Sequence, residues 1–226
     1  MSAEEKNMLG EWFLNGKSLD KHLQRAINFF DLAAKEGNPN AQNYLGLCYQ
    51  MGKDVEKDLQ KAFNYFKLAA NQNHTLALNS LGRCYQSGMG TQKDLKKAFE
   101  FFELAAKKGD AEAQASLGIM YLKREGVAKN LKEAVRYLKL AANQDDPEAL
   151  FTLGICFKKG LGVEKNFEAA VNCFELASKQ NHGDAQRYLG LCYGHGLGVK
   201  QNLKVAHRYF ELAAKQGPST AQIGFF

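Results

Sequence analysis

The chain has 226 residues, of which 45% are hydrophobic and 24% are charged, and its formal net charge is +6. This is the balance of an ordinary globular protein with enough apolar residues for a buried core, and the prevalence of helix-forming residues favours an all-α class. The modest positive charge favours solubility and weak attraction to acidic partners, so by itself it does not indicate a nucleic-acid-binding protein.

The N-terminal residues predict the compartment. Residues 1–7 read Met-Ser-Ala-Glu-Glu-Lys-Asn, without a basic stretch and without an apolar segment behind it. No apolar run elsewhere approaches the roughly 18 residues that a membrane span needs. We therefore expect a cytoplasmic protein with no secretory signal and no transmembrane segment.

An internal repeat of 36 residues governs the chain and is marked by a Leu-Gly pair, which returns at 9–10, 45–46, 81–82, 117–118, 153–154 and 189–190. Each leucine is followed four residues later by an aromatic residue, and a Leu-Ala-Ala or Leu-Ala-Ser block comes later in each repeat. Such self-similarity predicts a repeat architecture before any motif is considered. We expect six repeats and a truncated seventh, with these bounds: 5–40, 41–76, 77–112, 113–148, 149–184, 185–220 and 221–226.

Each repeat is predicted to form two helices joined by a turn. In the second repeat, Ala41, Leu45 and Tyr49 share one face of a first helix. A glycine ends this helix in most repeats, because glycine tolerates the left-handed conformation that closes the last turn. The second helix is expected to begin after an N-cap residue in each of the later repeats, namely Asp58, Asp94, Asn130, Asn166 and Asn202.

The glycine of the Leu-Gly pair indicates close packing. A glycine inside a helix costs about 1 kcal/mol relative to alanine, so its return in every repeat predicts a neighbouring helix too near for a Cβ atom. A single repeat cannot bury its own apolar face, and neighbouring repeats must therefore stack. We predict one domain over residues 1–226, an all-α, right-handed α-solenoid of helix-turn-helix repeats.

This pattern resembles the Sel-1-like repeat family, a relative of the tetratricopeptide repeats. The resemblance rests on the frame Ala41-x3-Leu45-Gly46-x2-Tyr49-x2-Gly52, on its later copies, and on the Lys-Ala and Ala-Ala pairs of the second helix. Arg124 departs from it by replacing a glycine. The resemblance implies an α-solenoid scaffold that bridges proteins in larger complexes, without enzymatic activity and without a cofactor.

Motifs for catalysis lack their context. Between Gly46 and Gly52-Lys53 there are five residues where a phosphate-binding Walker loop needs four, and the segment begins inside a predicted helix. Ser18-Leu19-Asp20-Lys21 matches the Ser-x-x-Lys string of penicillin-recognising enzymes, but the companion motifs are absent. Penicillin-binding relatives carry paired cysteines where this chain has Ala70 and Ala77. A penicillin-binding or hydrolase-like protein is therefore the least favoured alternative.

The cysteines are predicted to be packing residues. Four of them occupy one repeated position, which Met120 fills in the fourth repeat, and a site shared by Cys and Met is typical of a small apolar cavity. We expect no disulfide network, and no metal site because His195 lies at a helix end away from Cys156 and Cys192. The four repeated cysteines are Cys48, Cys84, Cys156 and Cys192.

A partner is expected on the side of each first helix that lies opposite the predicted core. The third, seventh and tenth residues of the helix fall on this side, which lines the concave groove of tetratricopeptide-like solenoids. Asparagine amides there could pair with a peptide backbone, and arginines could bind an acidic group. The apolar seventh positions are ambiguous, because they could equally pack between adjacent first helices. The predicted site is Asn43, Asn79, Arg83, Phe151, Ile155 and Arg187.

The alternative partner is RNA, because helical repeats of similar length read RNA one base at a time. Carboxylates at or beside the predicted groove argue against this, since they would repel phosphates; they are Glu4, Glu11, Glu112, Glu148 and Asp184. A protein or peptide is the preferred partner, with no nucleic acid expected.

The C-terminal residues 223–226 read Ile-Gly-Phe-Phe and are apolar where a solenoid normally ends in a polar cap. We expect that the chain is part of a longer protein, or that this end covers the last repeat or supports self-association.

Overall fold

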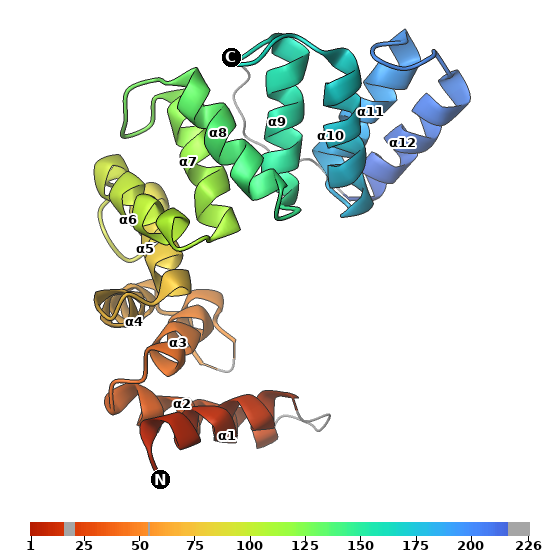
Figure 1. The fold of residues 1–226 in the computed structure, drawn as a ribbon. Helices are drawn as coiled ribbons and strands as arrows, with labels where there is room; N and C mark the ends of the chain where they lie inside the picture. The colour runs from red at the N-terminus through yellow and green to blue at the C-terminus, as the bar shows by residue number, and fades with distance from the viewer. Residues whose placement is uncertain (16–20, 54, 217–226) are drawn as a thin grey trace. The chain divides into compact units, whose positions relative to one another are not determined.

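The computed structural model describes residues 1–15, 21–53 and 55–216 (Figure 1). Residues 18–20 of the Ser-x-x-Lys string and the predicted seventh repeat lie outside these ranges. The described residues form helices and no β-strand: α1 (Ala3–Asn15), α2 (Lys21–Lys35), α3 (Pro39–Met51), α4 (Leu59–Asn71), α5 (Thr75–Ser87), α6 (Leu95–Lys107), α7 (Ala111–Lys123), α8 (Leu131–Ala142), α9 (Pro147–Lys159), α10 (Phe167–Lys179), α11 (Gly183–His195) and α12 (Leu203–Lys215).

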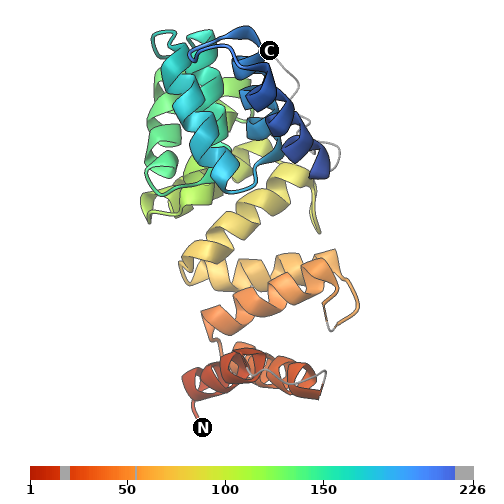
Figure 2. The same cartoon turned by 90° about the vertical axis from the view of Figure 1, so that its right-hand side faces the viewer.

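The chain forms two compact halves, which are residues 1–110 with α1–α6 and residues 111–226 with α7–α12. Within each half every odd-numbered helix packs on the even-numbered helix that follows it, and the pair then packs on the next pair. Figures 1 and 2 show this succession of pairs in each half. The predicted all-α class and the two-helix repeats are therefore confirmed. None of the described helices has the length and apolarity that a bilayer span requires.

Helix ends follow the predicted capping chemistry. Asp58 opens α4 by accepting a hydrogen bond from the Lys61 N–H at 2.9 Å, and the other predicted N-caps act in the same way. Gly52 closes α3 with φ +69° and donates its N–H to the Cys48 carbonyl at 2.9 Å. Arg124 has φ +61° just past α7, where most first helices have glycine. The left-handed conformation costs a non-glycine residue about 1–2 kcal/mol, so this departure from the repeat strains the turn.

The glycine of the Leu-Gly pair lies against a large side chain of the second helix. A Cβ atom added to Gly154 on α9 would lie 2.5 Å from Cε1 of Phe174 on α10. Real Cβ contacts are almost never this short, so the glycine fixes how closely the two helices approach. The predicted close packing is confirmed, and the corresponding pairs are Gly10–Phe30, Gly46–Phe66, Gly82–Phe102, Gly118–Leu138 and Gly190–Phe210.

All five cysteines are buried and none forms a disulfide. Burial raises the pKa of Cys84 to about 11 and that of Cys156 to about 12. These thiols are therefore protonated at neutral pH and are poor nucleophiles. The predicted packing role is confirmed, including the substitution by Met120, which is fully buried at the same repeated position.

The last described helix, α12, keeps an apolar side exposed. Phe210 is 39% exposed, whereas its counterpart Phe174 on α10 is 0% exposed. Phe174 is covered by the first helix of the following repeat, since it contacts the Tyr188 ring on α11 at a centroid distance of 5.3 Å. No following helix is described for Phe210. The apolar side that α10 buries against the following repeat is thus partly exposed to solvent on α12.

Histidine takes the N-cap role at the start of α5. His74 Nδ1 accepts a hydrogen bond from the Ala77 N–H at 3.3 Å, and Nε2 lies 2.8 Å from Asn40 Oδ1 near the start of α3. Both contacts suit a neutral ring that carries its proton on Nε2. Protonation of Nδ1 would remove the capping acceptor.

We expect the stability of the protein to depend on pH through this cap. Burial lowers the pKa of His74 from the usual 6.5, so folding favours the neutral ring. The stabilisation is present above pH 6.5 and is lost as the pH falls through the lower folded-state pKa, because the unfolded chain then binds more protons. His74→Asn keeps a capping acceptor, as Asn38 does at α3. Because asparagine does not titrate, this variant should lose less stability than the wild type as the pH falls. Thermal melts of both proteins from about pH 8 to pH 5 measure it. A parallel fall in both melting temperatures would contradict the assignment.

Candidate partner-binding surface

Three of the predicted residues at the third position of first helices are more buried than the sequence predicts, whereas Arg187 at the same position of α11 is exposed. Asn43 on α3 is 6% exposed, Asn79 on α5 is 4% exposed, and Phe151 on α9 is 1% exposed. The prediction that these three side chains lie opposite the core is therefore wrong. Their contribution to partner binding stays a prediction, and it would have to be indirect, through the positions of the helices that carry them.

The reason is that a first helix has more than one buried side. Phe151 contacts Phe174 of its own repeat at a ring-centroid distance of 5.9 Å, and it also contacts Tyr188 of the following repeat at 5.5 Å. It further stacks on the His182 ring at 4.7 Å. A helical wheel with one apolar face places the third position opposite the core and accounts for none of these contacts. The third position packs against the next repeat, and this packing leaves the Asn43 Oδ1 atom buried without a hydrogen-bond partner among the described residues.

The other three predicted residues retain accessible surface. In the N-terminal half, Arg83 is exposed on α5, one helical turn after Asn79. In the C-terminal half, Arg187 is exposed on α11, while Ile155 on α9 is partly buried against a core cluster. Ile155 therefore packs with one part of its surface and leaves another part accessible, and its contribution to partner binding stays a prediction.

Lys158 on α9 is not among the predicted site residues, but it lies with Arg187 of α11 beside one aromatic ring. The ammonium of Lys158 lies 4.6 Å from the centroid of the Tyr188 ring, and the Arg187 guanidinium carbon lies 5.4 Å from the same centroid. Tyr188 is buried, and this burial raises its pKa against the opposing effect of the Arg187 charge. Cations near an aromatic ring are stabilised by its electron-rich face. The tenth position, which Lys158 occupies, carries mostly leucine or glutamine in the other repeats. The lysine at this position is the sequence feature from which the contact could have been suspected.

Charge is divided along the first helices of the C-terminal half. Their first turns carry carboxylates, and their last turns carry basic side chains. This arrangement complements the helix dipole. The acidic residues are Glu112, Glu148 and Asp184, and the basic ones are Lys123, Lys158, Lys159 and His195.

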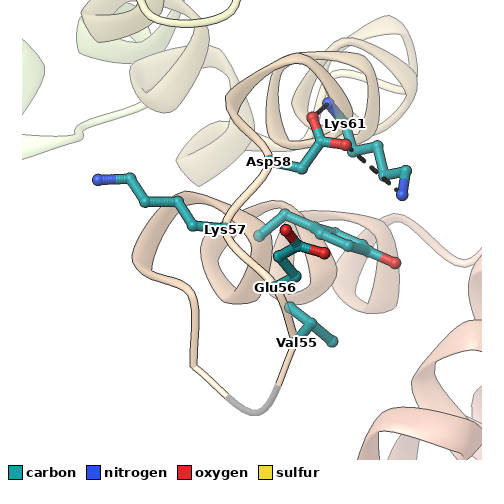
Figure 3. Close-up of a pocket in the computed structure, with 6 residues that line it drawn as sticks. Val55, Glu56, Lys57, Asp58 and Lys61 are labelled. Atoms are coloured by element: carbon teal, nitrogen blue, oxygen red, sulfur yellow. Dashed lines mark hydrogen bonds and ion pairs between the residues drawn. The ribbon is translucent and has the colours of Figure 1, made fainter.

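A polar hollow lies beside the turn between α3 and α4. Figure 3 shows Lys61 next to Asp58 across the start of α4, while Lys57 extends away from both. Lys61 Nζ lies 3.5 Å from Asp58 Oδ2 and 5.2 Å from the centroid of the Tyr49 ring, which also lines the hollow. The backbone N–H of Lys61 lowers the pKa of Asp58. These interactions are those of a helix N-cap, so we assign them to the stability of the start of α4 and assign no binding role to the hollow.

Metal-ligating side chains do not gather in the part of the chain that the structure describes. No group of three or more His, Cys, Asp and Glu residues within it could hold a metal ion.

Comparison with known proteins identifies the repeat. The sequence model described as "Sel1 repeat" matches almost the whole chain, at residues 6–38, 39–74, 75–110, 111–146, 147–182 and 183–218. Five of the six matches start at the first residue of a first helix, namely α3, α5, α7, α9 and α11, and the remaining match starts three residues into α1. No protein with a curated description matches the chain significantly.

Solved structures share the fold over nearly the full length. A Sel1 repeat protein from Oxalobacter formigenes is 31% identical with a TM-score of 0.86, and the match covers 95% of this chain and 88% of that one. A protective antigen of uropathogenic Escherichia coli strains, described as displaying an SLR fold, is 29% identical with a TM-score of 0.84. That match covers 96% of this chain but only 46% of the antigen, so the chain spans less than half of its length. An immunity protein from Pseudomonas aeruginosa, PA5088, is 18% identical over 95% of this chain and 81% of its own, with a TM-score of 0.62, and shares the fold alone.

Proposed function

The chain belongs to the Sel1 repeat family, and from this premise we propose that it is a non-enzymatic scaffold that binds a peptide or protein partner on its first helices. Sel1 repeat proteins are generally protein–protein interaction scaffolds. The finer assignment, to the accessible side of the first helices, is argued below from the exposed residues.

One observation carries the proposal: most buried positions carry the same residue types from repeat to repeat, whereas the accessible positions of the first helices do not. The buried positions recur from repeat to repeat as alanine, leucine, glycine and a cysteine or methionine. The seventh position of the first helices varies instead, and no side chain there is fully buried; its residues are Glu11, Leu47, Arg83, Ile119, Ile155 and Leu191. Residues that stabilise stacking are thus shared, while residues open to a partner are specific to a repeat. Conserved packing with variable exposed side chains is how helical repeat proteins build binding surfaces.

Capture experiments with charge-reversal variants test the proposal. The whole chain is immobilised, and proteins retained from an extract of the source cells are identified by mass spectrometry. We expect Arg83→Glu combined with Arg187→Glu to abolish capture, because both variants place a carboxylate where the partner binds. The control is Lys107→Glu combined with Lys179→Glu, which changes the net charge equally on exposed positions of the second helices α6 and α10.

Melting temperatures of the two double variants must agree with the wild type, so that loss of capture is not loss of folding. Capture that survives in the arginine variant would contradict the assignment to the first helices. Equal capture by an unrelated helical protein would contradict the scaffold function itself.

A further inference from the structure

We propose that Lys158 and Arg187 bind an acidic side chain in an extended peptide segment of the partner. This inference rests on the proposed function and names the chemistry of the partner at one place on the C-terminal half. It is carried by the directions in which the two cations extend, by the burial of the neighbouring carboxylate, and by the apolar residues next to them.

The position of the Lys158 ammonium is not explained by the dipole of its own helix. A lysine in the last turn of α9 would normally lie near the carbonyl groups at that end. The Lys158 side chain instead crosses to α11, where its ammonium lies over the Tyr188 ring. It forms no ion pair with a carboxylate among the described residues. Lys159 occupies the adjacent position in the same turn and is exposed.

Arg187 presents its charge to solvent although it is paired. Its guanidinium lies 3.1 Å from Asp184 Oδ1, and the side chain of Arg187 is 44% exposed whereas that of Asp184 is only 7% exposed. The carboxylate is covered and the guanidinium is not. Because a guanidinium has five N–H donors in a planar fork, donors remain for a second carboxylate. The group accessible to a partner at this place is therefore the guanidinium and not the carboxylate.

The residues beside the cations favour a peptide. Ile155 lies one helical turn before Lys158 and Leu191 one turn after Arg187, and both are partly buried. Side chains three or four residues apart on a helix share a face. The surface therefore offers two aliphatic contacts next to two cations, which suits an Asp or Glu flanked by apolar residues. Nucleic acid fits poorly, because Glu148 lies in the first turn of the same helix α9 and there is no run of cations for successive phosphates.

Selection from a phage-displayed library of random 12-residue peptides, with the whole chain as bait, tests the inference. We expect selected peptides to be enriched in Asp or Glu beside Leu, Ile or Phe. The affinity of the most enriched peptide is then measured by fluorescence anisotropy. Lys158→Glu and Arg187→Gln should each weaken binding roughly ten- to hundredfold, which is the range for loss of a charged hydrogen bond. Lys159→Glu makes the same charge change in the same turn of α9 and should leave the affinity within about twofold.

Circular dichroism melts show whether each variant is folded, and Arg187→Lys adds a second test because it keeps the charge but loses the planar fork. An intermediate affinity for this variant supports the inference.

Peptides without acidic enrichment, or equal weakening by Lys159→Glu, would overturn it and leave the scaffold function standing. Failure to select any peptide, together with failure of the capture experiment, would overturn both proposals. A single-stranded 12-nucleotide RNA that binds more tightly than the peptides and depends on the same two residues would also overturn it.

Discussion

Gly154→Ala is expected to lower the free energy of unfolding by about 1–3 kcal/mol, although alanine is the better helix former. The added Cβ atom would lie 2.5 Å from Cε1 of Phe174, which is 0% exposed. The ring must therefore shift, or α9 and α10 must separate. Either change removes close contacts in a packed interior. Urea denaturation followed by circular dichroism measures the effect.

Gly194→Ala is the matched control for this prediction. Gly194 is also in a first helix, α11, but a Cβ atom added there would meet only the Ala206 Cβ at 3.8 Å, which is an ordinary contact. Alanine should therefore stabilise the protein at this position, by up to about 1 kcal/mol. The two substitutions are chemically identical and are predicted to have opposite signs. If Gly154→Ala also stabilises the protein, the glycine does not set the distance between the two helices.

Phe174→Ala is expected to cost about 3–5 kcal/mol, whereas Phe210→Ala should cost about 1–2 kcal/mol. The two phenylalanines occupy the same repeated position, but Phe174 is fully buried and Phe210 is 39% exposed on α12. Truncation leaves a cavity at the first site and removes only partial burial at the second. Thermal unfolding of both variants at matched protein concentration compares them.

Repeating the unfolding of Phe174→Ala and Phe210→Ala at several protein concentrations tests self-association. If α12 is covered by a second copy in solution, Phe210→Ala will cost more at high protein concentration than at low concentration. A cost equal to that of Phe174→Ala at every concentration would instead show that the side of α12 bearing Phe210 is buried within one chain. This result would contradict the exposure on which the prediction rests.

The sequence was sufficient to predict the two-helix repeat, the starts of the second helices and the ends of most first helices. The period of 36 residues gives the repeat, Asp58 and its counterparts mark where second helices begin, and Gly52 and its counterparts mark where first helices end. These are local signals, since each depends on hydrogen bonds within a few residues. The close approach at Gly154 could also be predicted, because a helical glycine that returns in every repeat has no local explanation.

The surface was harder to predict, because it depends on contacts between repeats. Asn43 and Phe151 are buried against neighbouring helices, which a helical wheel of one helix does not contain. The pairing of Lys158 with Tyr188 joins side chains 30 residues apart in the sequence and on different helices. Arg83 and Arg187 keep the predicted exposure, since long charged side chains remain at the surface even on a crowded helix, and Ile155 keeps part of it.

The buried thiols give the molecule a built-in chemical probe. Cys48, Cys84, Cys156 and Cys192 lie at one position in four different first helices, each shielded by the same kind of packing. A maleimide reagent can alkylate such a thiol only when its surroundings transiently open, so labelling rates under native conditions report the opening of individual repeats. Mass spectrometry of the labelled peptides would then rank the repeats by how often each one opens, without any substitution in the chain.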